Sequence, residues 1–349
     1  MSDAVPRAGD FERIPKWLNL IPMVAQWLWL GLRHGSVSLP SAVNPHISTG
    51  GLVGEGKLEY FAIMGTLARA ATADFIAVAG DATEATVLGG LRDAGIEFPV
   101  VVKPDIGWCG YGVRLIASAE ALAAYRRVYP AGATLVVQRY LADEGEAGLF
   151  YVRGPDEARG RVIGVLLRYF PAVTGDGRRC LAELVAADVR LRRLIGDDRH
   201  EAAFDPDHVP ARGETTRLAL IGSTRVGGLY LDGTEHVTAR LTARLDAIAR
   251  DMRDFRVGRF DVRFASLASL RSGDFTIMEV NGAGSEAVHA WDPRYSIAEV
   301  YKIVFARQRL LFAVAAACRA AGGVPCGVVT LTRRFLAQRR LIRRYPRSN

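Results

Sequence analysis

The apolar and polar positions of this chain follow two different periods, which predict that helices and strands are mixed along one sequence. Short β-branched and aromatic runs between turn residues predict strands at 74–79, 98–103, 113–116, 134–138, 149–152, 162–168, 260–264 and 275–280. Apolar residues recurring every three or four positions predict helices at 17–32, 58–71, 83–94, 118–128, 181–194, 237–253 and 297–321. The pattern indicates an α/β chain, and 349 residues suffice for two or three lobes with cores.

One predicted strand ends in a lysine, Lys103, and a loop with three glycines, Gly107, Gly110 and Gly112, follows it. The strand would hold the ammonium group at a fixed point, and the glycines let backbone N–H groups approach an anion. A nucleotide polyphosphate suits this arrangement best. The alternative is a structural β-hairpin that binds nothing. The spacing fits neither the Walker pattern, since no Gly-Lys-Ser/Thr follows, nor the dinucleotide-binding pattern, since a strand follows the glycines.

A second group of polar residues lies on the predicted strands near positions 260 and 280. Alternation along a strand places Arg259, Asp261 and Arg263 on one face, and Glu279 and Asn281 also share a face. Two carboxylates and an amide oxygen are hard ligands of the kind that Mg²⁺ takes together with phosphate oxygens. The alternative is a surface hairpin whose acids pair with the two arginines.

Charge and cysteine content narrow the function classes. The net charge is +8, but seven arginines and no acid lie in 333–349, so the rest of the chain is near neutral and we expect no nucleic-acid partner. Lysine is rare, which makes a lysine before the glycine loop less incidental. The four cysteines and six histidines show neither disulfide nor metal spacing, so a cytoplasmic protein is expected.

The helix at 17–32 and the basic C-terminus raise the question of a membrane. The helix is uncharged and rich in Trp and Leu, but it is too short to span a bilayer and contains Asn19, Pro22 and Gln26. We expect it to be buried against the protein. The alternative is peripheral membrane contact, in which Lys16, Arg33 and the arginine-rich tail meet the headgroups.

The order of these motifs over residues 95–300 resembles the ATP-grasp superfamily, in particular carboxylate–amine ligases related to D-alanine–D-alanine ligase and cyanophycin synthetase. The resemblance implies ATP bound between a small antiparallel lobe and a larger catalytic lobe. For the nucleotide, it implies that Lys103 and the loop 105–113 contact the phosphates with Arg168 as a second cation, that Gln138, Tyr140 and Leu141 contact the adenine, and that Glu146 contacts the ribose. For the metal, it implies Asp261, Glu279 and Asn281 as magnesium ligands. For the reaction, it implies that Arg259 stabilises the tetrahedral intermediate and that the turn 175–177 lies beside the substrate. Three features depart from the family: Gln138 replaces a glutamate, Arg168 stands where lysine is more frequent, and 36–60 differs from the usual N-terminal lobe.

The resemblance also implies a domain order and a reaction. We expect an apolar N-terminal helix (1–35), an α/β lobe (36–97), a small lobe with the glycine loop (98–140), a catalytic lobe (141–312), and a C-terminal helix with a basic tail (313–349). ATP and Mg²⁺, as two ions or with Mn²⁺ as a substitute, would activate a small-molecule carboxylate as an acyl phosphate, which an amine then attacks, giving ADP.

Further residues are expected to serve this reaction. Arg259 and the backbone of Gly282 and Gly284 would stabilise the oxyanion. Candidates for gripping a substrate carboxylate are Arg153, Arg178, Arg225 and Arg263. Two alternatives stay open: another ATP-grasp outcome (a carboxylate–thiol ligase or a hydroxyl kinase), or a nucleotide-binding protein of the membrane surface.

Overall fold

The computed structural model describes residues 8–202 and 204–349. Its contacts divide the chain into two units. Unit 1 comprises Met1–Ala73, Ala142–Leu167 and Tyr230–Arg339, and unit 2 comprises Asp74–Leu141, Arg168–Leu229 and Arg340–Asn349. Both units combine helices with antiparallel strand pairs, so the predicted α/β class is confirmed.

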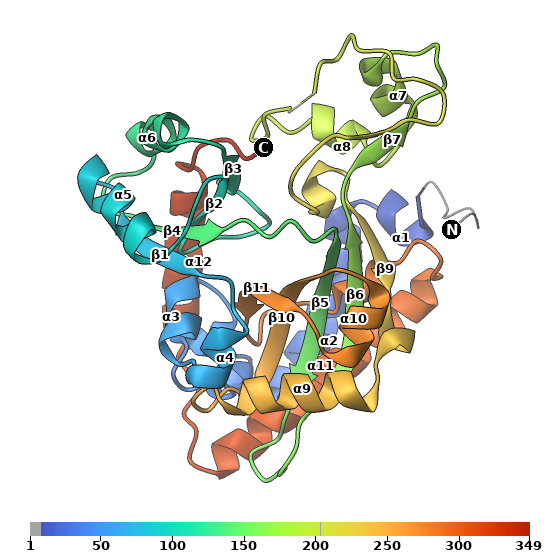
Figure 1. Ribbon diagram of the computed structural model, residues 1–349. Helices are drawn as coiled ribbons and strands as arrows, with labels where there is room; N and C mark the ends of the chain where they lie inside the picture. Colours follow the sequence, from blue (N-terminus) through green and yellow to red (C-terminus); the bar gives the residue numbers. More distant parts are fainter. Residues whose placement is uncertain (1–7, 203) are drawn as a thin grey trace. The chain divides into compact units, whose positions relative to one another are not determined.

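Unit 2 contains a four-stranded sheet in the order β1-β4-β2-β3 (Figure 1). The strands are β1 (Phe75–Ala79), β2 (Val100–Pro104), β3 (Arg114–Ile116) and β4 (Thr134–Arg139). Two helices, α5 (Glu84–Asp93) and α6 (Ala119–Arg127), share a core with the sheet, and each begins at a capping hydroxyl, that of Thr83 or Ser118. Strand β1, expected in a separate lobe with 36–73, instead pairs with β4 at the edge of this sheet.

The remainder of unit 2 contains the short pair β7 (Ala172–Thr174) and β8 (Thr215–Arg217), which the sequence pattern did not predict, and the 3₁₀ turn η3 (Thr224–Val226). The prediction of a single helix at 181–194 is wrong. Helix α7 (Leu181–Ala187) is capped by Asp188, and a second helix, α8 (Arg192–Ile195), begins after it. The Asp188 carboxylate accepts the N–H groups of Arg190 and Leu191 at 2.8 and 3.1 Å, so the side chain starts a new turn.

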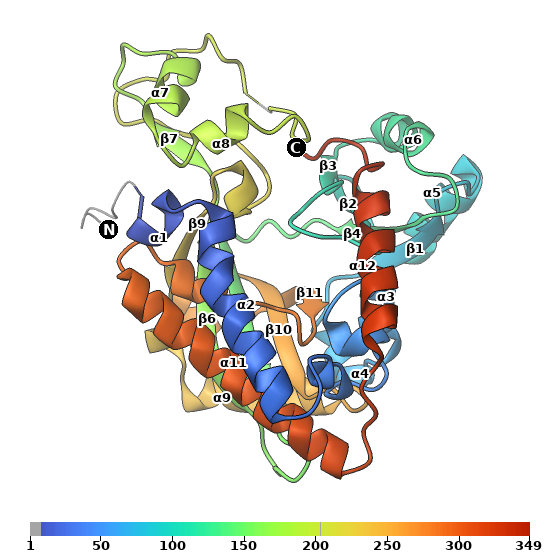
Figure 2. The ribbon, with the colours of Figure 1, turned by 180° about the vertical axis from the view of Figure 1, so that it is seen from behind.

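Unit 1 contains a five-stranded sheet in the order β11-β10-β5-β6-β9. The strands are β5 (Gly145–Val152), β6 (Arg161–Tyr169), β9 (Leu229–Asp232), β10 (Val257–Phe264) and β11 (Thr276–Asn281). Helix α9 (Ala239–Arg250) covers one face, and α2 (Lys16–Arg33) with α11 (Ile297–Ala320) covers the other (Figures 1 and 2). The Tyr151 hydroxyl donates to Asp246 of α9, while Val152, the next residue of β5, packs with Phe312 of α11. Neighbouring residues of one strand thus face opposite helix layers.

Two further features of unit 1 differ from the sequence predictions. The helix expected at 58–71 splits into α3 (Lys57–Ala62) and α4 (Thr66–Ala70), because the Gly65 N–H donates to the Asp251 carbonyl and the chain turns there. Between the strands expected at 260–264 and 275–280 lies a helix that was not predicted, α10 (Leu267–Ser272), which ends at Gly273 in a left-handed conformation. Shorter turns complete the unit: α1 (Asp10–Arg13), η1 (Leu39–Ala42), η2 (Ser48–Gly51), η4 (Thr234–His236) and η5 (Val288–Trp291).

The C-terminus folds back onto unit 2 after helix α12 (Val328–Ile342). Tyr345 is buried in the same core as α5 and α6, and the Asn349 carboxamide oxygen accepts the Leu115 N–H at 3.0 Å. The arginines of 333–349 are exposed, as expected for a solvated basic segment. Among the described residues, no helix combines the length and the apolar character needed to cross a bilayer.

Candidate functional site

In unit 2, the predicted phosphate lysine is held by a side chain of the neighbouring strand. Strands β2 and β4 pair with Val101 opposite Gln138, so Lys103 and Gln138 lie on the same face of the sheet. The Lys103 ammonium donates to the Gln138 carboxamide oxygen at 2.6 Å, and both side chains are buried. A neutral amide orients the lysine without cancelling its charge. The glutamine that departs from the expected pattern thus holds the Lys103 ammonium in a fixed position.

Side chains of unit 2 hold the carbonyl groups of the glycine loop that follows Lys103. The Tyr345 hydroxyl donates to the Ile106 carbonyl at 2.7 Å and the Tyr125 hydroxyl to the Gly112 carbonyl at 2.6 Å. Gly110 and Gly112 have φ values of 74° and 71°, which favour glycine. A Cβ on Gly112 would also lie 2.8 Å from the Pro104 ring, so the loop needs glycine there.

Arg225, predicted to grip a substrate carboxylate, has other partners in the structure. Its guanidinium group pairs with Asp197, donates to the Cys109 carbonyl at 3.1 Å, and lies 4.3 Å from the Tyr111 ring centre. It also donates to the Ser348 hydroxyl at 2.7 Å. Arg225 therefore joins the glycine loop to the C-terminal residues of unit 2, which is a structural role.

In unit 1, the pairing of β10 with β11 brings together the residues predicted to bind magnesium. Asp261 lies directly opposite Glu279, and Arg259 lies opposite Asn281. The Arg259 guanidinium donates to both Asp261 oxygens, at 2.6 and 2.8 Å, and the Asn281 amide donates to one of them at 3.1 Å. The Asp261–Arg259 pair is the one that the surface-hairpin alternative expected, but both side chains are largely shielded from solvent.

Lys57 completes this group, and its role was not predicted. Its ammonium lies 3.4 Å from a Glu279 oxygen, and the lysine is buried. Carboxylates directly opposite one another on paired strands repel, so each needs a positive charge nearby. Arg259 supplies one for Asp261 and Lys57 supplies one for Glu279. The available signal was the rarity of lysine, since Lys57 is one of few in the chain.

The donor set of this group fits a magnesium ion by its chemistry. Asp261 and Glu279 offer carboxylate oxygens from facing positions, and the Asn281 carboxamide can offer its oxygen. Within 8–202 and 204–349, no cluster of three or more His, Cys, Asp or Glu side chains could hold a metal. An ion at this site would therefore depend on phosphate oxygens and water for its remaining ligands, as Mg²⁺ commonly does.

The segment 36–60 closes one side of the group. The Glu55 carboxyl is deeply enclosed, and this burial raises its pKa to about 7. The Tyr60 hydroxyl is buried close to Gly51 and Gly282, and a Cβ on Gly282 would lie 2.6 Å from the hydroxyl oxygen. The unusual N-terminal segment thus packs directly against the end of β11.

That packing corrects the expectation for the glycines after β11. The Gly284 N–H donates to the Gly51 carbonyl at 2.7 Å, and the Ala283 N–H donates to the Gly50 carbonyl at 3.2 Å. The N–H group of Gly284 is therefore already engaged by the backbone and is not available to an oxyanion. Gly282 and Gly284 instead permit a close approach of two backbones, because a Cβ on Gly284 would lie 2.4 Å from the Leu52 carbonyl oxygen.

Arg263 and Glu146, predicted to bind substrate and ribose, are buried and paired with each other. They lie opposite one another on β10 and β5, with 3.2 Å between guanidinium and carboxylate. Arg263 also donates to the Asp143 carbonyl at 2.7 Å. The structure thus gives both residues a partner within the sheet rather than showing them directed at a ligand.

The other predicted residues are more dispersed. Arg153 follows β5, and the register places it five positions from Gly148, the residue opposite Asp261, or roughly 17 Å along the strand. Arg178 is exposed in the turn after β7, where its N–H donates to Asp176. Arg168, the last residue but one of β6, is half-buried, and Tyr140 and Leu141 are half-buried after β4.

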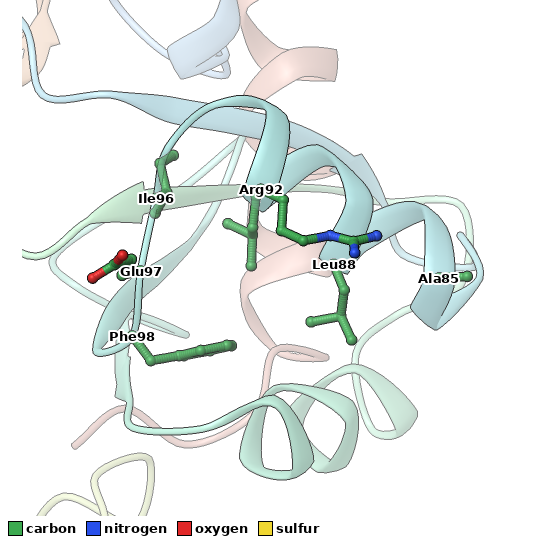
Figure 3. Close-up of a pocket in the computed structure, with 7 residues that line it drawn as sticks. Ala85, Leu88, Arg92, Ile96, Glu97 and Phe98 are labelled. Carbon is green, nitrogen blue, oxygen red and sulfur yellow. The ribbon is translucent and has the colours of Figure 1, made fainter.

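A cavity of about 530 Å³ in unit 2 lies apart from Lys103 (Figure 3). Residues of α5 and of the segment before β2 line it: Ala85, Leu88, Leu91, Arg92, Ile96, Glu97 and Phe98. Because β2 runs from Val100 to Pro104, this apolar cavity lies at the start of the strand and Lys103 near its other end. The cavity is not where the sequence places the phosphates.

Arg307 of α11 is buried in unit 1, and none of its three guanidinium nitrogens has a hydrogen-bond partner among residues 8–202 and 204–349. Burial lowers its pKa to about 10. The pKa of the buried His289 is lowered mainly by burial, and the Arg307 charge lowers it further. An uncompensated buried charge destabilises a fold. We expect Arg307→Met to raise the free energy of unfolding by about 1–3 kcal/mol at neutral pH. Urea unfolding checks this, with Arg309→Met, at an exposed position of the same helix, as the unchanged control. Equal or lower stability of Arg307→Met would show that the guanidinium has a partner in solution.

The buried His200 side chain makes the stability of unit 2 depend on pH. The imidazole is buried beside the C-terminus, 3.3 Å from the Ser348 hydroxyl, and this burial lowers the pKa to about 4. Between pH 6.5 and 4 the unfolded chain therefore binds more protons than the folded chain, so stability falls as the pH falls. We expect the melting temperature to drop from pH 7 to pH 4.5, and to drop less in His200→Gln. His208→Gln, at an exposed position, should behave as the unaltered chain. A drop of the same size in His200→Gln would contradict this account.

Comparison with known proteins gives structural likeness only. No protein-family model matches the chain, and no curated protein does. The chain is similar to a bifunctional glutathione synthetase from Pasteurella multocida, with 20% identity over 72% of this chain and 36% of that one, at a TM-score of 0.38. It is similar to D-alanine–D-alanine ligase from Bacillus anthracis, with 14% identity over 76% and 70% of the chains and a TM-score of 0.40. It is also similar to the VanG D-Ala:D-Ser ligase from Enterococcus faecalis, with 14% identity over 76% and 63% and a TM-score of 0.41. The chain thus spans about a third of the length of the glutathione synthetase.

Proposed function

We propose that this chain is an ATP-grasp enzyme that joins a small-molecule carboxylate to an amine, consuming ATP with Mg²⁺ and releasing ADP. The observation that carries the proposal is the facing pair Asp261 and Glu279, each beside one cation, on the strands where the motif order places magnesium ligands. The buried Lys103 before a loop that requires glycine supports a polyphosphate as the second ligand.

The proposed reaction has two steps. An oxygen of the substrate carboxylate attacks the γ-phosphorus of ATP, the bond to the bridging β-phosphate oxygen breaks, and an acyl phosphate and ADP form. The amine then attacks the activated carbonyl, loses a proton, and inorganic phosphate leaves. Mg²⁺ held by Asp261, Glu279 and Asn281 would neutralise charge on the phosphates.

The chain's own residues would contribute charge and position rather than a nucleophile. Lys103, oriented by Gln138, would bind phosphate oxygens. Arg259, fixed by its two bonds to Asp261, would stabilise the oxyanion of the second step. Lys57, whose ammonium lies 3.4 Å from a Glu279 oxygen, would hold that carboxylate in place.

The test is ADP release, measured over pairs of amino acids and dicarboxylates with amines in the presence of Mg²⁺. Hydroxylamine added in place of the amine should give a hydroxamate, because an acyl phosphate reacts with it. ADP release with a thiol acceptor would identify a carboxylate–thiol ligase. ADP release with a hydroxyl acceptor and no hydroxamate would identify a hydroxyl kinase. No ADP release with any pair would contradict the proposal.

A further inference from the structure

Helix α2 of unit 1 presents an apolar half to solvent. We define the α2 face as the exposed residues Trp17, Leu18, Leu20, Ile21, Val24, Ala25, Leu28, Trp29 and Leu32. At 100° per residue these positions occupy one half of the helix, and no polar side chain lies among them. Trp17 is 64% exposed and Leu32 is 80% exposed. A contiguous apolar surface of this kind marks an interaction site.

The two uncharged polar residues of α2, Asn19 and Gln26, lie on its protein-facing side. The Asn19 amide donates to the Phe11 carbonyl at 2.9 Å, and the Gln26 amide donates to the Phe305 carbonyl of α11 at 3.0 Å. Trp27, on the same side, packs edge-on against Phe312 of α11 at 5.0 Å. An ordinary surface helix has the reverse arrangement, with polar residues outward. The Asn19 and Gln26 amides of α2 therefore have hydrogen-bond partners within the protein, and the solvent-facing side of the helix fits an apolar partner.

The charges around the α2 face indicate what that partner carries. No Asp or Glu occurs from 13 to 54, while Lys16 and Arg33 are exposed at the two ends of the helix. Helix α11, which lies beside α2 in Figure 2, exposes Lys302 and Arg309 together with one acid, Glu299, whose carboxylate accepts the Ser296 N–H at the start of the helix. The surface thus combines an apolar stripe with positive charge, which complements negative headgroups over hydrocarbon.

The two exposed tryptophans of α2, Trp17 and Trp29, favour a lipid surface over a protein surface. Trp17 lies in the first turn of α2 and Trp29 near its end, and indole rings prefer the boundary between headgroups and acyl chains. We propose that the α2 face docks on an anionic lipid bilayer, with the helix parallel to the membrane plane. This inference goes beyond the proposed ligase function and does not depend on it.

Vesicle sedimentation tests the proposal with the full chain. We expect the chain to bind phosphatidylcholine vesicles that contain phosphatidylserine, to bind pure phosphatidylcholine less, and to be released as salt rises. Ile21→Glu with Leu28→Glu should weaken binding roughly tenfold or more, because both positions lie central in the α2 face. The matched controls, Val324→Glu and Ile195→Glu, alter residues that are 84% and 61% exposed elsewhere and should bind normally.

A second variant separates binding from folding. Trp17→Phe with Trp29→Phe should still bind the vesicles but lose the blue shift of tryptophan emission that the unaltered chain shows on binding. ADP release with soluble substrates should be unchanged in all these variants. A lipid-free dimer that Ile21→Glu and Leu28→Glu convert to a monomer would overturn the proposal in favour of a second copy as the partner. Vesicle binding that survives both glutamates would also overturn it.

Discussion

Glu279→Gln is expected to reduce ATP turnover by roughly 100-fold or more while leaving the chain folded. The amide keeps the shape of the side chain but removes the charge that faces Asp261 and would bind the metal. It also removes the attraction to the Lys57 ammonium at 3.4 Å. The measurement is the rate of ADP release at saturating substrates, with circular dichroism and the melting temperature recorded for the same samples.

The control for this prediction is Glu235→Gln in the same unit, where the carboxylate is 63% exposed. This variant should release ADP at the unaltered rate. A Glu279→Gln protein that remains folded and retains full turnover would exclude Glu279 from the reaction and leave its pair with Lys57 as purely structural. Higher Mg²⁺ concentration should partly restore turnover if the carboxylate binds the ion.

Lys103→Met is expected to have the second large effect, a rise of roughly 100-fold in the KM for ATP or an equal fall in kcat. Methionine fills the volume of the lysine stem but cannot attract phosphate. It also leaves the buried Gln138 carboxamide oxygen without the donor it has at 2.6 Å, which costs about 1–3 kcal/mol of stability. Stability and nucleotide binding therefore have to be separated.

The double variant Lys103→Met with Gln138→Leu separates them. Replacing both partners with apolar groups should recover stability, because no buried oxygen is left without a donor, but ATP use should remain lost. Lys302→Met, at an exposed lysine of α11, serves as the charge-matched control and should not change the kinetics. If the double variant recovered both stability and ATP use, Lys103 would be a structural residue only.

The elements that the sequence predicted well are those with strong local signals. Strand β2 ending near Lys103, helix α6 after the Ser118 cap and helix α2 all lie within a few residues of their expected bounds. The failures come from single hydrogen bonds that the hydrophobic pattern does not encode. Asp188 starts a new turn because its carboxylate accepts N–H groups just after it in the chain, and Gly65 turns the chain because the backbone carbonyl of the distant Asp251 accepts its N–H.

For the candidate site, the sequence predicted the local arrangement along one strand but not the contacts between distant segments. Alternation along strands correctly placed Arg259 and Asp261 on one face, because the period of a strand is local. It could not show that Lys57 reaches Glu279, or that the carbonyls of Gly50 and Gly51 take the N–H groups of Ala283 and Gly284, since these contacts join distant segments. It also could not show that Arg225 and Arg263 already have acidic partners.

The central claim is that Lys103 binds the phosphates of ATP and that Glu279 binds the metal ion of the reaction. The most direct test is a crystal structure of the chain with Mg²⁺ and a non-hydrolysable ATP analogue. The account predicts phosphate oxygens within hydrogen-bond distance of the Lys103 ammonium and a metal ion at the Glu279 carboxylate. A nucleotide bound away from Lys103, or a metal ion bound away from Glu279, would contradict it.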